Sequence, residues 1–225
     1  MKAMTKGTVC AIALLLTLAP TTALSGSPSA KFAAQVSNLM IIPETSYATW
    51  TPVLGTGMKV PEKKELLIGV SFETGLYTRT QVKGKGGERD KAEATAIIKV
   101  RVLVDGVPAW PPEVVYDRRA QTLEAVFGGV SHCEDLNGDG MIDVGSECIL
   151  TDEEITFITD TMAAHHFNFV AANVTTGFHQ LTVEVMITSS GSTPSAEAMG
   201  TVGRGSLIVE DVRATNTEYG VVLLE

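Results

Sequence analysis

Two stretches of this chain alternate apolar and polar residues with a period of two. Between residues 92 and 104, one side carries Ala94, Ala96, Ile98, Val100, Val102 and Val104, and the other carries Thr95, Lys99 and Arg101. Between residues 179 and 188, His179, Leu181, Val183, Val185 and Ile187 alternate with Gln180, Thr182, Glu184 and Thr188. Such a period places all the apolar side chains on one face of a strand. It predicts two half-buried strands and disfavours a helical protein.

Further strand patterns fill most of the remaining chain. Residues 65–82, 122–127, 167–171 and 205–212 are rich in β-branched and aromatic residues, and 39–43 and 219–224 are short apolar runs. Turn signals separate these runs, including Asp105-Gly106. The prediction is a mainly β fold, an antiparallel β-sandwich of jelly-roll or immunoglobulin-like type, in one domain over residues 39–225. The Ser/Ala-rich segment 26–38 is expected to be flexible.

The N-terminus has the pattern of an export signal. Lys2 and Lys6 precede an apolar run from Val9 to Ala19, and small and polar residues follow. The run is about eleven residues, short of the roughly 20 that a membrane-spanning helix needs. Residues 1–25 are therefore predicted to be a signal peptide, with an N-terminal anchor as the alternative. The mature protein is expected to be secreted, whether extracellular, periplasmic or on the cell surface.

The charge balance limits the partners that the mature chain would bind. The whole chain has 17 Lys and Arg against 26 Asp and Glu. Loss of Lys2 and Lys6 leaves 17 − 2 = 15 basic residues, for a net charge of 15 − 26 = −11. This argues against nucleic acid and anionic membranes as partners, and no later apolar run is long enough to span a bilayer. A protein or polysaccharide ligand and a homo-oligomer remain open.

Two cysteines remain after signal removal, Cys133 and Cys148. In an exported chain, such a pair predicts a disulfide. The alternative is two free thiols or zinc ligands, but the residues between them are hard oxygen donors, which suit zinc poorly.

Oxygen-bearing side chains alternate between these cysteines. Asp135, Asn137, Asp139 and Asp143 fall at positions 1, 3, 5 and 9 of a loop, and the backbone carbonyl of Met141 falls at position 7. Gly140 stands where such a loop turns sharply, and apolar Ile142 is expected to pin the loop to the core. This spacing of oxygen ligands suits calcium. An acidic turn that binds no metal is the alternative.

The run from Asp135 to Glu147 resembles the calcium loop of EF-hand and dockerin proteins. The resemblance implies calcium as the cofactor, held by Asp135, Asn137, Asp139, Met141 and Asp143. The family's bidentate glutamate at position 12 is replaced here by Ser146. Glu147 is one place later and is the expected last ligand, with Glu153, Glu154 or water as alternatives. No helical pattern precedes Asp135, so we expect a static structural site rather than a sensor.

A helix is predicted directly after this loop. Thr151 and Glu154 form a capping box, and Ile155, Ile158 and Met162 recur at helical spacing. A helix over residues 152–164 follows from this pattern, and the loop and helix together would form an insertion over 129–165.

Other candidate sites have weaker patterns. His132, His165, His166 and His179 would make a transition-metal site if the fold gathered them, and Trp50 and Trp110 would serve either ligand stacking or packing. No motif of an enzyme class is present.

Residues 177–185 and 205–210 resemble the closing strands of immunoglobulin-like and jelly-roll domains of exported proteins, which implies a sandwich and no activity. The predicted function is a secreted, non-enzymatic binding or structural protein with a structural calcium site. The alternative is an exported carbohydrate-binding module or glycan-active enzyme that uses the acidic loop.

Overall fold

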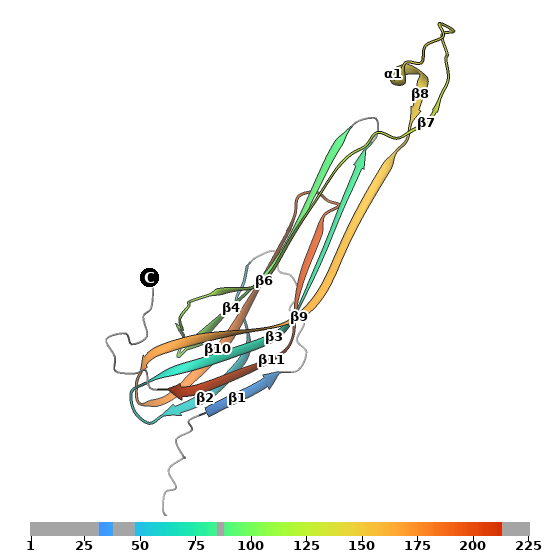
Figure 1. The fold of residues 1–225 in the computed structure, drawn as a ribbon. Helices are drawn as coiled ribbons and strands as arrows, with labels where there is room; N and C mark the ends of the chain where they lie inside the picture. Colours follow the sequence, from blue (N-terminus) through green and yellow to red (C-terminus); the bar gives the residue numbers. More distant parts are fainter. Residues whose placement is uncertain (1–31, 38–47, 85–87, 213–225) are drawn as a thin grey trace, which may run out of the picture.

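The computed structural model describes residues 32–37, 48–84 and 88–212, which form long antiparallel strands and one short helix (Figure 1). The elements are β1 (Phe32–Ser37), β2 (Thr51–Val60), β3 (Lys64–Gly84), β4 (Arg89–Val104), β5 (Val107–Pro108), β6 (Val114–Val126), β7 (Val130–Cys133), α1 (Val144–Glu147), β8 (Cys148–Leu150), β9 (Glu153–Val174), β10 (Gly177–Gly191) and β11 (Glu197–Val212). The mainly β prediction is confirmed.

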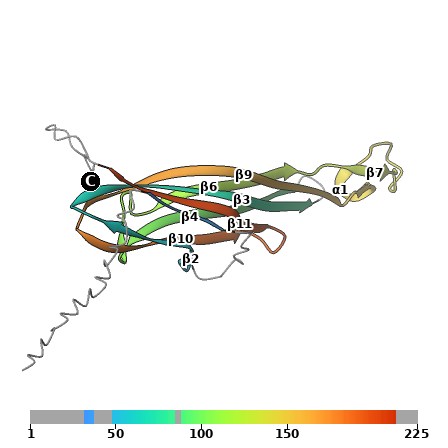
Figure 2. The ribbon, with the colours of Figure 1, turned by 90° about the horizontal axis from the view of Figure 1, so that it is seen from below.

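Two sheets face each other and form the predicted sandwich (Figure 2). The first sheet has the order β1-β11-β3-β9. The second has the order β2-β10-β4, with β5 and β6 both paired to β4. A separate two-stranded sheet joins β7 and β8. Within the described residues, every strand pairing is antiparallel, as short turns between successive strands favour.

One end of the sandwich, the base, encloses the main hydrophobic core. The predicted inward faces of β4 and β10 lie in it, and its fully buried members include Val60, Leu66, Ile68, Val70, Ile98, Val100, Val102, Phe169, Leu181, Val183, Val185, Leu207 and Val209. These side chains come from both sheets and fill the space between them. Burial of this apolar area is the main stabilising contribution to the base.

The long strands continue beyond the base as a narrow arm, which points to the upper right in Figure 1. We define the arm as residues 77–84, 89–95, 117–127, 153–165 and 188–201. Its apolar cluster is small and consists of Val82, Ala92, Ala94, Phe127 and Ala196. Three of these five residues are alanines, so the cluster buries little apolar area per residue.

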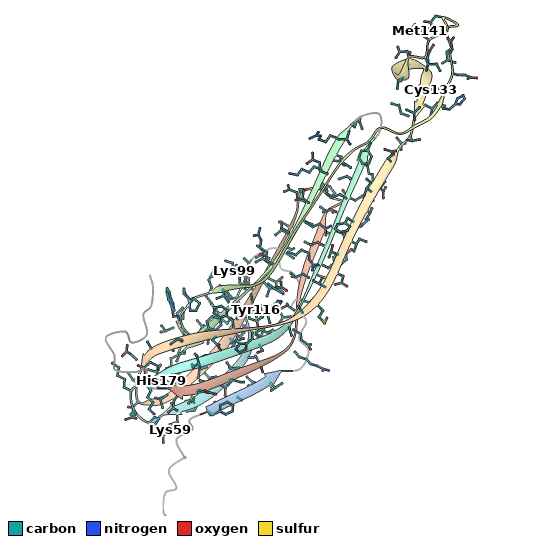
Figure 3. The ribbon with its side chains drawn as sticks, viewed as in Figure 1. Lys59, Lys99, Tyr116, Cys133, Met141 and His179 are labelled. Carbon is teal, nitrogen blue, oxygen red and sulfur yellow. A yellow bond between two sulfur atoms is a disulfide. The ribbon has the colours of Figure 1, made fainter. Side chains whose placement is uncertain are left out.

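Two strand irregularities mark the junction of base and arm. β6 shifts register against β4 at Tyr116, and β11 shifts register against β3 between Val202 and Gly205. An extra residue in one strand bends it and increases its twist. The ribbon bends at this level, where Tyr116 lies (Figure 3).

The phenol of Tyr116 ties the two sheets together at the junction. Its oxygen accepts the backbone N–H of Phe72 at 3.0 Å and lies 2.5 Å from the carbonyl oxygen of His165, to which it donates. Burial raises the pKa of Tyr116 to about 12, so the phenol keeps its proton and remains a donor at neutral pH.

A polar network fills the interior of the arm. The buried side chain of Gln121 accepts hydrogen bonds from Thr78 and Thr159 at 2.8 Å and donates to Thr80 at 2.7 Å. Arg119 donates to the carbonyl oxygens of Leu76 at 2.6 Å and Thr159 at 3.1 Å. Side chains of β6 therefore hold β3 and β9 by directional hydrogen bonds.

The helix predicted over 152–164 is wrong. Residues 153–164 lie in β9, which pairs with β3 in one continuous register from Leu66↔Ala171 to Gly84↔Glu153. The segment contains Ile155, Thr156, Phe157, Ile158, Thr159 and Thr161, which suit a strand better than a helix. Pairing along the whole length of β3 makes this segment a strand. The insertion predicted over 129–165 is therefore shorter and ends before β9 begins at Glu153.

The prediction of a flexible segment over 26–38 is wrong for residues 32–37. They form β1, which pairs with the edge of the first sheet from Phe32↔Glu210 to Ser37↔Gly205. Backbone pairing with an open strand edge stabilises a segment that has little apolar pattern of its own. The predicted signal peptide over 1–25 and the apolar runs 39–43 and 219–224 lie outside the described residues.

Candidate functional site at the tip of the arm

A small cross-linked unit, the tip, ends the arm and comprises residues 130–150. Strands β7 and β8 pair antiparallel, and Cys133 lies directly opposite Cys148. The predicted disulfide between them is present. Figure 3 places Cys133 and Met141 at the far end of the molecule from the base.

The predicted ligand side chains organise the loop through backbone hydrogen bonds. Both carboxylate oxygens of Asp135 accept backbone N–H groups, from Gly138 at 2.7 Å and Gly140 at 2.8 Å. Asn137 accepts the N–H of Asp139 at 2.9 Å, and Asp139 accepts that of Met141 at 2.8 Å. These short-range bonds are typical of Asp and Asn in turns.

The loop turns at its glycines. Gly138 and Gly140 have φ values of 72° and 82°, which glycine adopts without the steric penalty of a side chain. The sharp turn predicted at Gly140 is confirmed.

Glu147 lies at the centre of the loop rather than at its rim. It is buried, and one of its oxygens accepts the N–H groups of Leu136 at 3.1 Å and Asn137 at 3.2 Å. Its other oxygen accepts the N–H of Asp143 at 2.9 Å, while the Asp143 side chain caps α1 through the N–H of Gly145. In this arrangement, Glu147 links the two halves of the loop.

The side chains suit calcium in chemistry but not in their arrangement. Each Asp135 oxygen accepts one N–H and retains a second lone pair, and all the donors are hard oxygens. Among the residues that the structure describes, however, no group of three or more His, Cys, Asp or Glu side chains is arranged to hold a metal ion. The calcium set of Asp135, Asn137, Asp139, Met141, Asp143 and Glu147 thus remains a prediction.

Apolar side chains project from the tip into solvent. Ile142, which was expected to pin the loop to the core, is 53% exposed, so that prediction is wrong. The tip lies beyond the end of the sandwich and has no core nearby. Leu136 is 70% exposed, Met141 is 75% exposed, and Val144 and Ile149 are also exposed. Exposed apolar groups gathered in this way are typical of interaction sites.

A second candidate site lies at the opposite end of the base. A cavity of about 500 Å³ is lined in part by Val107, Asn173, Asp105 and His179. His179 Nδ1 lies 2.6 Å from an oxygen of Asp105, and Nε2 lies 2.7 Å from the carbonyl oxygen of Thr175. The Asp105 carboxylate and this carbonyl are both acceptors, so both contacts are hydrogen bonds when the imidazole of His179 is protonated.

The ionisation of this pair follows from its hydrogen bonds. The bond to Asp105, together with the one to the Thr175 carbonyl, raises the pKa of His179 above its ordinary value. The backbone N–H of Gln180 and the imidazole of His179 hold the pKa of Asp105 below its ordinary value. Both nitrogens of His179 are thus occupied in holding the fold.

The remaining candidates from the sequence have separate places. His165 lies at the junction, 3.4 Å from Asp117, whereas His166 faces the outer surface and bonds to Ser71 and Asn168 at 2.8 and 2.9 Å. The predicted alternative of a four-histidine metal site has no support, because no metal-holding histidine group occurs in the described part of the chain.

The two tryptophans serve packing and pairing. Trp50 lies under the guanidinium of Arg101 at 4.3 Å, and Trp110 bridges to Val170 at the edge of the first sheet. The structural roles of Tyr116 and Gln121 were not predicted. Polar residues at alternate positions of a strand inside a sandwich would have indicated a buried hydrogen-bond network.

Comparisons with known proteins leave the family of this chain open. No protein-family model matches it, and none of the curated proteins does. A chain from a structure of infectious bursal disease virus Gx strain aligns with 90% of this chain at 9% identity and a TM-score of 0.17. This chain covers 44% of that chain, and a TM-score of this size shows no shared fold. Over the described residues, no helix combines the length and apolarity needed to cross a membrane.

Proposed function

We propose that this chain is a secreted, non-enzymatic binding protein in which a calcium-loop tip is held away from the base on a β arm. The observation that carries the proposal is the exposure of Leu136, Met141 and Ile142 on a loop cross-linked by Cys133 and Cys148. A cross-linked loop loses little conformational entropy when it binds, so its exposed apolar groups contribute more of their free energy to affinity.

The partner best suited to this tip is a protein with an apolar patch and a basic rim. The tip carries Glu134, Asp135, Asp139, Asp143 and Glu147 but no Lys or Arg. Opposite charges around an apolar contact favour association and orient it. A carbohydrate ligand has less support, because no aromatic residue for stacking on a sugar lies between Val130 and Leu150.

Calcium is proposed as the structural ion of the tip. It would be held by Asp135, Asn137, Asp139, the carbonyl of Met141, Asp143 and Glu147, and it would relieve the repulsion among these carboxylates. Binding requires the side chains to turn toward a common centre, with Glu147 giving up part of its hydrogen bonding to the backbone.

The calcium proposal is tested by calorimetry and hydrogen exchange on the oxidised mature protein. We expect calcium to bind with an affinity of about 10⁻⁴ to 10⁻³ M, as in extracellular modules. Calcium should also slow amide exchange in the tip while leaving the base unchanged. Asp139→Asn should weaken binding, and Asp160→Asn on the arm is the matched control. The calcium site would be refuted if calorimetry detects no binding heat and the amide exchange rates of the tip are the same with calcium and with chelator.

The binding proposal is tested with two baits, the native protein and Leu136→Ser/Met141→Ser, each in calcium and in chelator. Proteins of the surrounding medium that bind through the tip should be retained by the native bait alone. Equal retention by both baits would show that the tip is not the binding site.

A further inference from the structure

The arm stretch of β9 is an open sheet edge. On one side β9 pairs with β3, and on its other side the only described pairing partner is Trp110, which exchanges two hydrogen bonds of 2.8 Å with Val170 in the base. Pro111 and Pro112 follow Trp110 and lack the N–H groups that would extend this pairing. The base part of the edge is therefore covered, while none of the residues that the structure describes pairs with the outer side of residues 153–168. Figure 1 shows this stretch of β9 as the outer strand of the arm.

The register identifies the backbone groups that face outward. In an antiparallel ladder, successive residues point their N–H and C=O groups to opposite sides. Val170 points outward to Trp110, and the register of β9 is continuous. Every second residue from Glu154 to Asn168 therefore presents both groups at the open edge. Such an edge is a template for another strand unless charge, proline or a covering segment protects it.

Both faces of this stretch expose apolar side chains. On the outer face, Ile158 is 54% exposed and Met162 is 74% exposed. On the inner face, Ile155 and Phe157 are also exposed, although Val82, which lies opposite Ile155 on β3, is fully buried. The second sheet thus covers β3 but leaves β9 projecting beyond it.

We propose that a second copy of this chain pairs its β9 with this open edge, antiparallel and about a two-fold axis near Asp160. The strand is complementary to itself in this orientation. Its first residues, Glu153 and Glu154, are acidic, and its later residues include His165 and His166. Antiparallel pairing brings the acidic end of each copy to the histidine end of the other.

The apolar groups of the strand lie near the proposed axis. Ile158 and Met162 flank Asp160 on the outer face, so pairing places those of one copy beside those of the other. Cross-strand apolar pairs stabilise a sheet, whereas the two Asp160 side chains near the axis oppose association. The first sheets of the two copies would become one continuous sheet, with the two tips at opposite ends of the paired β9 strands.

The test is sedimentation velocity on the mature protein over a range of concentrations. Two variants address the edge. Ile158→Lys adds a charge to an exposed side chain, and Ala164→Pro removes an outward N–H without removing a bond to β3. Val36→Lys, on the strand at the opposite edge of the same sheet, is the control. We expect a monomer–dimer equilibrium whose dissociation constant rises at least about tenfold in both edge variants and is unchanged in the control.

Circular dichroism melting must show that all three variants fold. A mature protein that remains monomeric at about 1 mM would overturn the proposal, because its association would then be weaker than about 4 kcal/mol. Dimers that persist in both folded edge variants, or that dissociate equally in Val36→Lys, would place the interface elsewhere. A protein of the medium that displaces the second copy from the edge would show instead that the edge receives a strand from another protein.

Discussion

The base and the arm are built from the same strands but are stabilised by different interactions. In the base, β3 contributes Leu66, Ile68 and Val70 to an apolar core, whereas in the arm it contributes Thr78 and Thr80 to a hydrogen-bonded network. Apolar burial depends on area, while a buried network depends on every donor and acceptor being paired. The arm should therefore open locally at a lower free energy than the base.

The largest expected effect comes from a matched pair of phenylalanines. Phe169 is fully buried in the base, and Phe127 is 2% exposed in the arm cluster. Phe169→Ala should lower the free energy of global unfolding by about 3–5 kcal/mol, because it leaves a cavity in the main core. Phe127→Ala should speed hydrogen exchange mainly in the arm. Equal loss of protection in both regions would mean that base and arm unfold as one unit.

The arm network gives an intermediate effect. Gln121→Leu removes the partner of three threonine hydroxyls and should cost the arm about 1–3 kcal/mol. Gln81→Leu replaces a half-buried glutamine on the outer face of β3, whose side chain donates to Glu154 and Thr156 at the surface, and should change stability by less than about 0.5 kcal/mol. Amide exchange of β6 and β9 measures both. If the two variants lose the same stability, the interior network contributes no more than the surface hydrogen bonds of Gln81.

The smallest effect is a pH dependence confined to the base. The pKa of His179 is raised, so its contribution is complete below the ordinary value of 6.5 and is lost as pH rises through the folded value. The pKa of Asp105 is lowered, so its contribution is present above 3.8 and is lost as pH falls through the folded value. The pair of His179 and Asp105 therefore stabilises the base most between the ordinary pKa of Asp, 3.8, and that of His, 6.5.

Melting midpoints between about pH 6 and pH 9 test this pair. The native protein should lose stability relative to His179→Gln as pH rises, while the exchange rates of the arm, corrected for intrinsic pH dependence, should show no matching step. Parallel pH curves for the two proteins would exclude a charged His179.

The interior of the sandwich was predictable from local patterns, and its extent was not. The alternations at 92–104 and 179–188 are the buried faces of β4 and β10, because a period of two leaves one arrangement in which both strands bury apolar groups. The extension of the sandwich into the arm was not predicted, because Arg119 and Gln121 are polar and face inward at positions where core residues are normally apolar. Only the facing hydroxyls of Thr78, Thr80 and Thr159 explain the burial of Gln121.

At the candidate site, the disulfide and the turn at Gly140 were predicted correctly, because cysteine pairing and positive φ depend on local chemistry. The burial predicted for Ile142 was wrong, because it assumed a core that the end of an arm does not have.

By itself, the sequence determined the strands with one apolar face, the disulfide between Cys133 and Cys148, and the loop whose donors suit calcium. These features follow from contacts within a strand or between near neighbours. The tertiary structure alone decided that residues 153–164 extend as a strand, because twenty residue pairs with β3 outweigh a helix cap and three apolar residues at helical spacing. It also left the arm edge of β9 open, since an edge is a property of the assembled sheet and of no single segment.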